Sequence, residues 1–197
     1  GPRLEIAPSA AHPLPDWADL PDDPIEAARV LLRQGRIVAI KGLGGYHLAC
    51  DATNPDAVRL LRQRKGRAAK PFAVMVASLD AARALCEIDA AGEQVLAVRE
   101  RPIVLLPWRE GSPVAQDVAP GLRELGVMLP YTPLHHLLLE PAPDFPPALV
   151  MTSGNFSEEP IATADDDAQG RLAPLCDAFL LHNRAIHIRC DDSVVQP

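Results

Sequence analysis

Short apolar runs of strand length alternate along this chain with longer segments of helical periodicity. Strand-like runs occupy residues 36–41, 46–51, 71–76, 102–106, 148–151 and 178–181. Amphipathic periodicity predicts helices at residues 25–34, 55–65, 79–97, 133–140 and 165–176. Three helices begin with a capping side chain followed by proline, at Asp23-Pro24, Asn54-Pro55 and Thr132-Pro133. The alternation predicts an α/β domain, and because some neighbouring strands are joined too tightly to be parallel, we expect a mixed sheet.

The two ends of the chain show weaker patterns. Residues 1–23 are rich in proline, alanine and aspartate without periodicity, so we expect a partly disordered linker or a strap over the domain of residues 24–197. Gly1-Pro2 is typical of the scar left when a purification tag is cleaved off, which predicts a fragment of a larger, multidomain protein. Residues 178–181 and 186–188 are expected to form a hairpin around Asn183-Arg184.

Composition excludes several classes of protein. No stretch approaches about 18 consecutive apolar residues, so no segment is expected to span a membrane. The four cysteines stand apart without a C-x-x-C pair, which argues against a zinc ribbon or a disulfide framework and favours a reducing cytoplasm. The net charge of −7 makes the surface as a whole a poor partner for polyanions, nucleic acid included. Any phosphate binding must therefore come from a local basic cluster.

One such cluster exists between residues 59 and 70. It contains no acidic residue and six basic ones: Arg59, Arg62, Arg64, Lys65, Arg67 and Lys70. Cations at a helix C-terminus can simply complement the helix dipole, which would explain Arg64 and Lys65. Arg67 and Lys70, however, lie beyond Gly66 in the loop that leads into the next strand. Since loops at strand ends are where α/β proteins bind anions, the cluster is a candidate phosphate site.

Two further loops are candidates for ligand contact. The Gly42-Leu43-Gly44-Gly45 turn matches neither common phosphate-loop motif; it is either a tight turn that needs positive φ or a place where a ligand approaches the backbone. The run from Thr152 through Ser153, Asn155 and Ser157 offers hydroxyls, a carboxamide and backbone N–H groups after a buried strand. These residues either form local turns or donate hydrogen bonds to phosphate or adenine. No G-x-S-x-G elbow is present, so we do not expect a serine nucleophile.

Histidines and aspartates provide weaker signals. His135-His136 lies on an apolar helix, so at least one of the two histidines is expected to be packed rather than to bind a metal. Asp191 and Asp192 follow Arg189 near the end of the chain. They could hold Mg²⁺ through water or could merely form a turn.

Five blocks, taken in order, resemble the YrdC-like family, and in particular the YrdC-like domain of HypF-type carbamoyltransferases. The blocks are residues 41–52, 64–75, 126–136, 151–155 and 189–195. The resemblance implies a YrdC-like twisted mixed parallel and antiparallel sheet flanked by helices, with a concave, positive cavity. It also implies an ATP site in which Lys65, Arg67, Ser153 and Asn155 hold the nucleotide and Ser193 lies near the phosphates.

The predicted site combines the motifs with this resemblance. The residues expected to bind the nucleotide are Lys65, Arg67, Thr152, Ser153, Asn155, Ser157, Arg189 and Ser193. Lys65, Arg67 and Lys70 are expected to be catalytic, with Lys70 orienting the acyl group, and Mg²⁺ is expected as a cofactor. Lys41, Gly42, Gly44, Tyr46 and His47 are expected to form the carbamoyl pocket. The chain departs from the family here, because glycines replace the threonine-rich block with which relatives bind threonine.

The function expected from the resemblance is ATP-dependent formation of carbamoyl-adenylate from carbamate, with release of pyrophosphate. The carbamate would derive from carbamoyl phosphate, and other domains of the full-length chain would pass the carbamoyl group to the partner HypE for the cyanide ligands of [NiFe]-hydrogenase. A first alternative is a threonylcarbamoyl-adenylate synthase for tRNA modification. A second is a non-catalytic RNA-binding module, against which the acidic charge and an aromatic content of 4% both argue.

Overall fold

Strands and helices alternate along the chain in the computed structural model, which describes residues 1–156 and 159–197. The strands are β1 Leu4–Pro8, β2 Val38–Lys41, β3 Tyr46–Asp51, β4 Ala73–Met75, β5 Ile103–Pro107, β6 Glu124–Met128, β7 Leu149–Ser153, β8 Ala178–His182 and β9 Val194–Val195. The α-helices are α1 Pro24–Arg33, α2 Pro55–Lys65, α3 Leu79–Leu85, α4 Ala90–Ala97, α5 Pro133–Leu138 and α6 Asp165–Leu172. Two short 3-10 helices lie at Trp17–Asp19 and Gln116–Val118.

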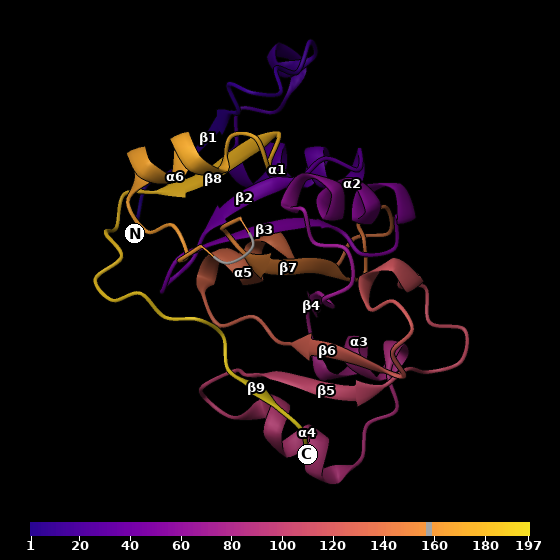
Figure 1. The fold of residues 1–197 in the computed structure, drawn as a ribbon. Coiled ribbons are helices and arrows are strands. Elements are labelled where there is room, and N and C mark those ends of the chain that lie inside the picture. Colours follow the sequence, from indigo (N-terminus) through magenta and orange to yellow (C-terminus); the bar gives the residue numbers. More distant parts are fainter. Residues whose placement is uncertain (157–158) are drawn as a thin grey trace.

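The strands in the described part of the chain form one sheet in the order β1-β8-β2-β3-β7-β4-β6-β5-β9 (Figure 1). The pairs β2–β8, β4–β6 and β5–β9 are parallel. The pairs β1–β8, β2–β3, β3–β7, β4–β7 and β5–β6 are antiparallel. The predicted α/β class with a mixed sheet is therefore confirmed.

Local capping explains where the helices begin. The Asp23 side chain accepts hydrogen bonds from the backbone N–H groups of the first turn of α1, and Asn54 does the same for α2. Thr132 Oγ1 accepts from the third residue of α5. Each cap satisfies N–H groups that have no partner within the helix, and a proline follows each of them at a position where no N–H is needed.

Alternate strand residues pack into two hydrophobic layers. On one face, side chains such as Leu48, Val150 and Val127 pack against α2, α3, α4 and α6. On the other face, Ile40 and Met151 pack with α1 and α5. Helices thus cover both faces of the central strands β2, β3 and β7, whose residues are almost all buried.

Several predicted elements differ from the structure. Residues 4–8 form the edge strand β1, where no strand was expected, and residues 186–188 do not form the second arm of a hairpin. Strand β8 pairs with β1 along one edge and with β2 along the other, so neither edge is left for residues 186–188. Strands β6 and β9 were not predicted, and α6 ends at Leu172 rather than at residue 176. None of the helices described here has both the length and the apolar character needed to cross a membrane.

Candidate nucleotide site

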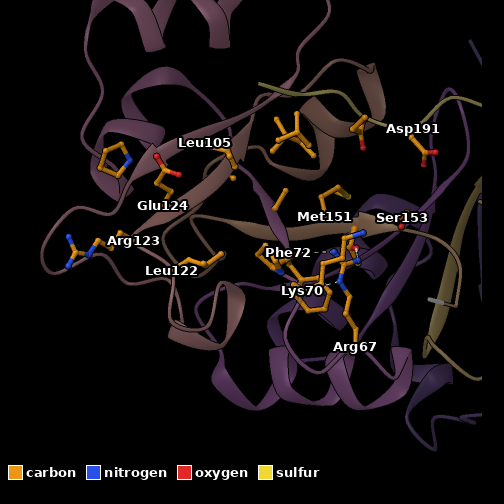
Figure 2. A pocket seen from close by; sticks show the side chains of 18 residues that line it. Arg67, Lys70, Phe72, Leu105, Leu122, Arg123, Glu124, Met151, Ser153 and Asp191 are labelled. Carbon is orange, nitrogen blue, oxygen red and sulfur yellow. Dashed lines mark hydrogen bonds between the residues drawn. The ribbon is translucent and has the colours of Figure 1, made fainter. Parts of the chain in front are cut away.

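A cavity of about 770 Å³ lies on the sheet face that carries α1 and α5, over β4, β5, β6 and the end of β7 (Figure 2). Its floor is made by strand side chains, among them Ile103, Leu105 and Met151. The loop that follows α2 contributes Arg67 and Lys70 to its rim, and Arg123 and Glu124 lie at the far end (Figure 2). The cavity is therefore largely apolar at its floor and charged around its margin.

A second, smaller pocket of about 270 Å³ adjoins this cavity at the end of β7. The two share Arg67, Lys70 and Ser153. Lys65 and Asn155 complete the polar lining of the small pocket, and among the residues that the structure describes (1–156 and 159–197) no acidic side chain lines it. Three cations around a space of this size favour an anion such as phosphate.

Lys65, the last residue of α2, projects into the small pocket from a buried stem. The left-handed Gly66 (φ 62°) ends the helix directly after it, so the Lys65 ammonium is directed at the loop after β7. There Nζ donates to the Ser153 and Asn155 carbonyl oxygens at 2.7 Å each, and to Asn155 Oδ1 at 3.2 Å. Burial, followed by the nearby Arg67 and Lys70 charges, lowers the pKa of Lys65 to about 7. An anionic ligand in the pocket would therefore favour the charged form of Lys65 strongly.

The basic loop after α2 is held by Arg62, a residue whose role the sequence did not reveal. Its guanidinium is buried and donates to the carbonyl oxygens of Arg67 (3.1 Å) and Lys70 (3.0 Å). It also donates to the carbonyl oxygens of Asp117 (2.5 Å) and Val118 (3.0 Å). Arg62 thereby fixes the loop against a distant segment, and both Arg62 and Arg67 stack over the Phe72 ring.

Arg67 lies at the junction of the two cavities. One guanidinium nitrogen donates to Thr152 Oγ1 at 3.3 Å, and others donate to the carbonyl oxygens of Lys70 and Pro71. Burial, followed by the Arg62 charge, lowers the pKa of Arg67. The predicted residues Lys65, Arg67 and Thr152 are therefore brought together by the structure.

The loop after β7 presents Ser153 and Asn155 to the same pocket. Ser153 Oγ donates to Asn155 Oδ1 at 2.8 Å, and Asn155 Nδ2 donates to the Glu159 carbonyl oxygen at 2.5 Å. Gly154 between them approaches β3 so closely that its N–H lies 2.6 Å from the Tyr46 carbonyl oxygen. Ser157, also predicted to bind the nucleotide, lies outside the described residues.

Substituting Gly154 by alanine is expected to destabilise the protein. A Cβ at this position would lie 2.6 Å from the Tyr46 carbonyl oxygen, and backbone atoms there cannot move aside without disturbing the β3–β7 pairing. Overpacking of this kind costs about 1–3 kcal/mol, which urea denaturation will measure. Gly170→Ala is the matched control, because its Cβ would meet nothing within 4 Å in α6 and should stabilise the helix by ~0.5–1 kcal/mol. Equal effects of both substitutions would contradict the prediction.

The glycines of the β2–β3 turn are needed for close packing of the chain. Gly42, Gly44 and Gly45 all have ordinary φ angles, so the proposed need for positive φ is wrong. A Cβ on Gly44 would lie 2.5 Å from the Cys190 carbonyl oxygen, and one on Gly45 would lie 1.9 Å from Ile161 Cγ2. What comes close to these glycines is the chain's own backbone and side chains.

The residues predicted to form the carbamoyl pocket divide between the two faces of the sheet. Lys41 and Tyr46 are paired across β2 and β3 and turn to the face of α6, where Lys41 Nζ lies 2.6 Å from Asp165 Oδ1 and the Tyr46 hydroxyl donates to the same oxygen at 2.5 Å. His47 turns to the opposite face. Gly42 and Gly44 line a separate, mainly apolar cavity of about 800 Å³ together with Lys41.

Asp165 is a residue that sequence reasoning missed, since its position in an acidic run indicated only the start of a helix. Burial by itself raises the pKa of Asp165, but the hydrogen bonds from Lys41 and Tyr46 outweigh it, and the pKa lies below its ordinary value. Burial, followed by the hydrogen bond to Asp165, raises the pKa of Tyr46. The carboxylate thus ties the β2–β3 turn to α6.

His47 belongs to a second polar cluster, with Tyr131 and Asp192. His47 Nε2 lies 2.8 Å from Asp192 Oδ2, and the Tyr131 hydroxyl donates to Asp192 Oδ1 at 3.3 Å. Burial by itself raises the pKa of Asp192. The hydrogen bond and charge of His47 and the hydrogen bond from Tyr131 outweigh this effect, so the pKa lies below its ordinary value and the carboxyl is ionised at neutral pH. His135 packs edge-on against Tyr131, and burial, with His47 as the next cause, lowers its pKa to about 3. His135 is fully buried and His136 exposed, as expected for a packed helix.

The remaining predicted residues lie near the end of the chain. Asp191 and Asp192 line the cavity of about 770 Å³. The described residues include no group of three side chains suited to a metal ion. Both Asp192 oxygens already take part in hydrogen bonds within the protein. Mg²⁺ binding by this pair stays a prediction. Ser193 and Arg189 are exposed, and the Ser193 carbonyl oxygen accepts a hydrogen bond from Ile103 N.

The family of the chain follows from its similarity to known proteins. A family model described as telomere recombination, which covers Sua5, YciO and YrdC proteins, matches residues 30–197, and the chain belongs to this family. Within it, the chain is homologous to one domain of the HypF carbamoyltransferases. HypF of Rhodobacter capsulatus is 52% identical over the whole of this chain, which covers 25% of that protein.

Solved structures and more distant relatives agree with this assignment. A crystal structure of full-length HypF in a phosphate- and nucleotide-bound form matches the whole chain with a TM-score of 0.89 and 42% identity, over 24% of its own length. The mouse threonylcarbamoyl-AMP synthase is 28% identical over 74% of this chain and 51% of its own. The chain thus spans about a quarter of the length of the HypF relatives that it matches.

Proposed function

We propose that this chain binds ATP and joins carbamate to its adenylyl group, forming carbamoyl-adenylate. The observation that carries the proposal is the small pocket around Lys65, Arg67 and Lys70, which opens directly into a cavity of about 770 Å³. The small pocket suits phosphate groups, and the larger cavity has room for a nucleoside. A structure of full-length HypF is phosphate- and nucleotide-bound, which supports nucleotide binding as part of the proposal.

Each group has a role that its position allows. Lys65 and Arg67 neutralise the phosphates, while Ser153 and Asn155 line the small pocket with neutral polar groups. The apolar floor and the Phe72 ring accommodate the nucleoside. Lys70 lies at the junction of the cavities, where it would orient the carbamoyl group. Mg²⁺ bound with ATP would offset part of the phosphate charge.

The reaction requires no protein nucleophile. A carbamate oxygen attacks the α-phosphorus of ATP, the bond between the α-phosphorus and the bridging oxygen breaks, and pyrophosphate leaves with that electron pair. The negative charge that develops on the phosphates is stabilised by the positioned cations, which is how catalysis of phosphoryl and nucleotidyl transfer chiefly operates. In the longer protein, further domains would release carbamate from carbamoyl phosphate and pass the carbamoyl group to HypE during hydrogenase maturation.

ATP binding is expected to be accompanied by proton uptake. Lys65 has a pKa of about 7 in the free protein, so at pH 8 most of it is neutral, and a bound triphosphate favours its charged form. Affinity should therefore fall as the pH rises from 7 to 9. Calorimetry at pH 8 in buffers of different ionisation enthalpy measures the uptake directly, and Lys65→Met should abolish it. An enthalpy that does not depend on the buffer would contradict this prediction.

The proposed activity is tested by pyrophosphate release. The protein is incubated with Mg-ATP and a mixture of ammonia and bicarbonate, which supplies carbamate by spontaneous equilibration, and release should depend on both nitrogen and carbon sources. Efficient release with threonine and bicarbonate instead would support a threonylcarbamoyl-adenylate synthase, as in the mouse relative. Salt-dependent RNA binding without affinity for ATP would support the RNA-binding alternative.

A further inference from the structure

The segment between β8 and β9, residues 183–193, runs across the ends of the strands from one side of the sheet to the edge strand on the other (Figure 1). This segment, called the strap below, rests on the β2–β3 turn. The Cys190 N–H donates to the Gly44 carbonyl oxygen at 3.1 Å. Because even a single Cβ on Gly44 would collide with Cys190, no side chain of a substrate can lie between the turn and the strap.

The strap places one carboxylate at a fixed position on the cavity wall. His47 and Tyr131 each bind one oxygen of Asp192, so the side chain has little freedom. His47 is the direct partner of Ser153 in the β3–β7 register, and Ser153 lines both cavities. The Asp192 carboxylate therefore lies close to the end of β7, where the small pocket adjoins the cavity of about 770 Å³.

Near Ser153 the charges that line the cavity are separated by sign. Arg67 and Lys70 lie on one side of Ser153, and Asp191, next to Asp192 on the strap, lies on the other (Figure 2). The small pocket suits phosphates, which leaves the strap side for the acyl group. A carboxylate offers about four lone-pair positions, so Asp192 can accept a further hydrogen bond beyond the two that hold it.

We propose that Asp192 is a specificity-determining residue that selects carbamate and rejects carbamoylated amino acids. The inference rests on the proposed function and adds the basis of its substrate choice. The amino group of carbamate donates a hydrogen bond to the Asp192 carboxylate. A carbamoylated amino acid such as that of threonine carries an α-carboxylate beside the same nitrogen, and the like charge of Asp192 repels it. His47 and Tyr131 are positioning residues that act through Asp192.

The test compares Asp192→Asn, which keeps the shape of the side chain and removes its charge, with Asp166→Asn, which removes one exposed carboxylate on α6. Two quantities are measured for each: the ratio of pyrophosphate release with ammonia and bicarbonate to that with threonine and bicarbonate, and L-threonine binding to protein loaded with a non-hydrolysable ATP analogue, by ligand-observed NMR. We expect Asp192→Asn to lower the ratio by about tenfold or more and to strengthen threonine binding. Asp166→Asn should leave both unchanged.

The positioning role has its own measurement. His47→Ala should speed tryptic cleavage after Arg189, because it releases the strap, and should lower the substrate ratio in the same direction as Asp192→Asn. An unchanged ratio and unchanged threonine binding in Asp192→Asn would overturn the proposal, as would an equal loss of turnover with both substrates. If the wild type releases no pyrophosphate, the proposed function fails, and threonine binding alone still decides whether Asp192 excludes amino acids.

Discussion

The double variant Lys65→Ala/Arg67→Ala is expected to bind ATP about a hundredfold to ten-thousandfold more weakly than the wild type. Each charge-assisted hydrogen bond contributes about 1.5–3 kcal/mol, and every 1.4 kcal/mol corresponds to about a tenfold change in affinity. Both side chains are held at the phosphate pocket by the protein itself, so little ordering is needed when the ligand arrives. Calorimetric titration with Mg-ATP measures the loss, and turnover should become undetectable.

Arg59→Ala is the matched control for this experiment. Arg59 belongs to the same basic run on α2, but its side chain is exposed and pairs with Asp56 and Asp117. Its removal should leave ATP affinity within about twofold, because exposed ion pairs contribute little and it lies outside both cavities. Unchanged ATP affinity in a folded double variant would refute the assignment of the phosphate pocket.

Substitution of Arg62 is expected to have the second largest effect, although Arg62 lines neither cavity. Arg62→Met keeps much of the packing on Phe72 but removes the buried guanidinium hydrogen bonds to four carbonyl oxygens, of which those of Lys70 and Val118 keep a second donor. Loss of a buried network of this kind should lower the free energy of unfolding by about 3 kcal/mol or more. ATP affinity should fall as well, because the loop that carries Arg67 and Lys70 loses its attachment to residues 117–118.

Urea denaturation and ATP titration together separate these two effects. Arg59→Met, one turn earlier on α2, is the control and should change neither quantity appreciably. If Arg62→Met lowers the free energy of unfolding as expected but the folded protein binds ATP with unchanged affinity, Arg62 supports the fold without positioning the basic loop.

Local features of the fold could be predicted from the sequence, whereas the pairing of distant strands could not. The caps at Asp23, Asn54 and Thr132 and the stop at Gly66 act within one helical turn, and all four occur as predicted. The hairpin near Asn183 failed because β8 finds partners 140 and more residues away, in β1 and β2. Short edge strands such as β1 and β9 gain their conformation from these neighbours rather than from their own periodicity.

The candidate site shows the same division. The basic run and the loop after β7 could be recognised because each is contiguous in the sequence, and the structure brings Lys65, Arg67 and Asn155 to one pocket. Asp165 meets Lys41 and Tyr46 across more than 100 positions, and Arg62 looked like one cation among six. Contacts between residues so far apart in the sequence form only in the folded chain, so no local sequence pattern predicts them.

The first and last strands of the chain have a consequence for how the protein fails. β1 and β9 cover the outer edges of β8 and β5, whose sequences AFLLH and IVLLP are strongly apolar. If either short terminal strand frays, the backbone N–H and C=O groups of an apolar strand are left open to pair with another molecule. Detachment of β1 would therefore first appear as aggregation, with the cavity beside Arg67 and Lys70 still intact, whereas detachment of β9 would also remove Val194 from the wall of that cavity.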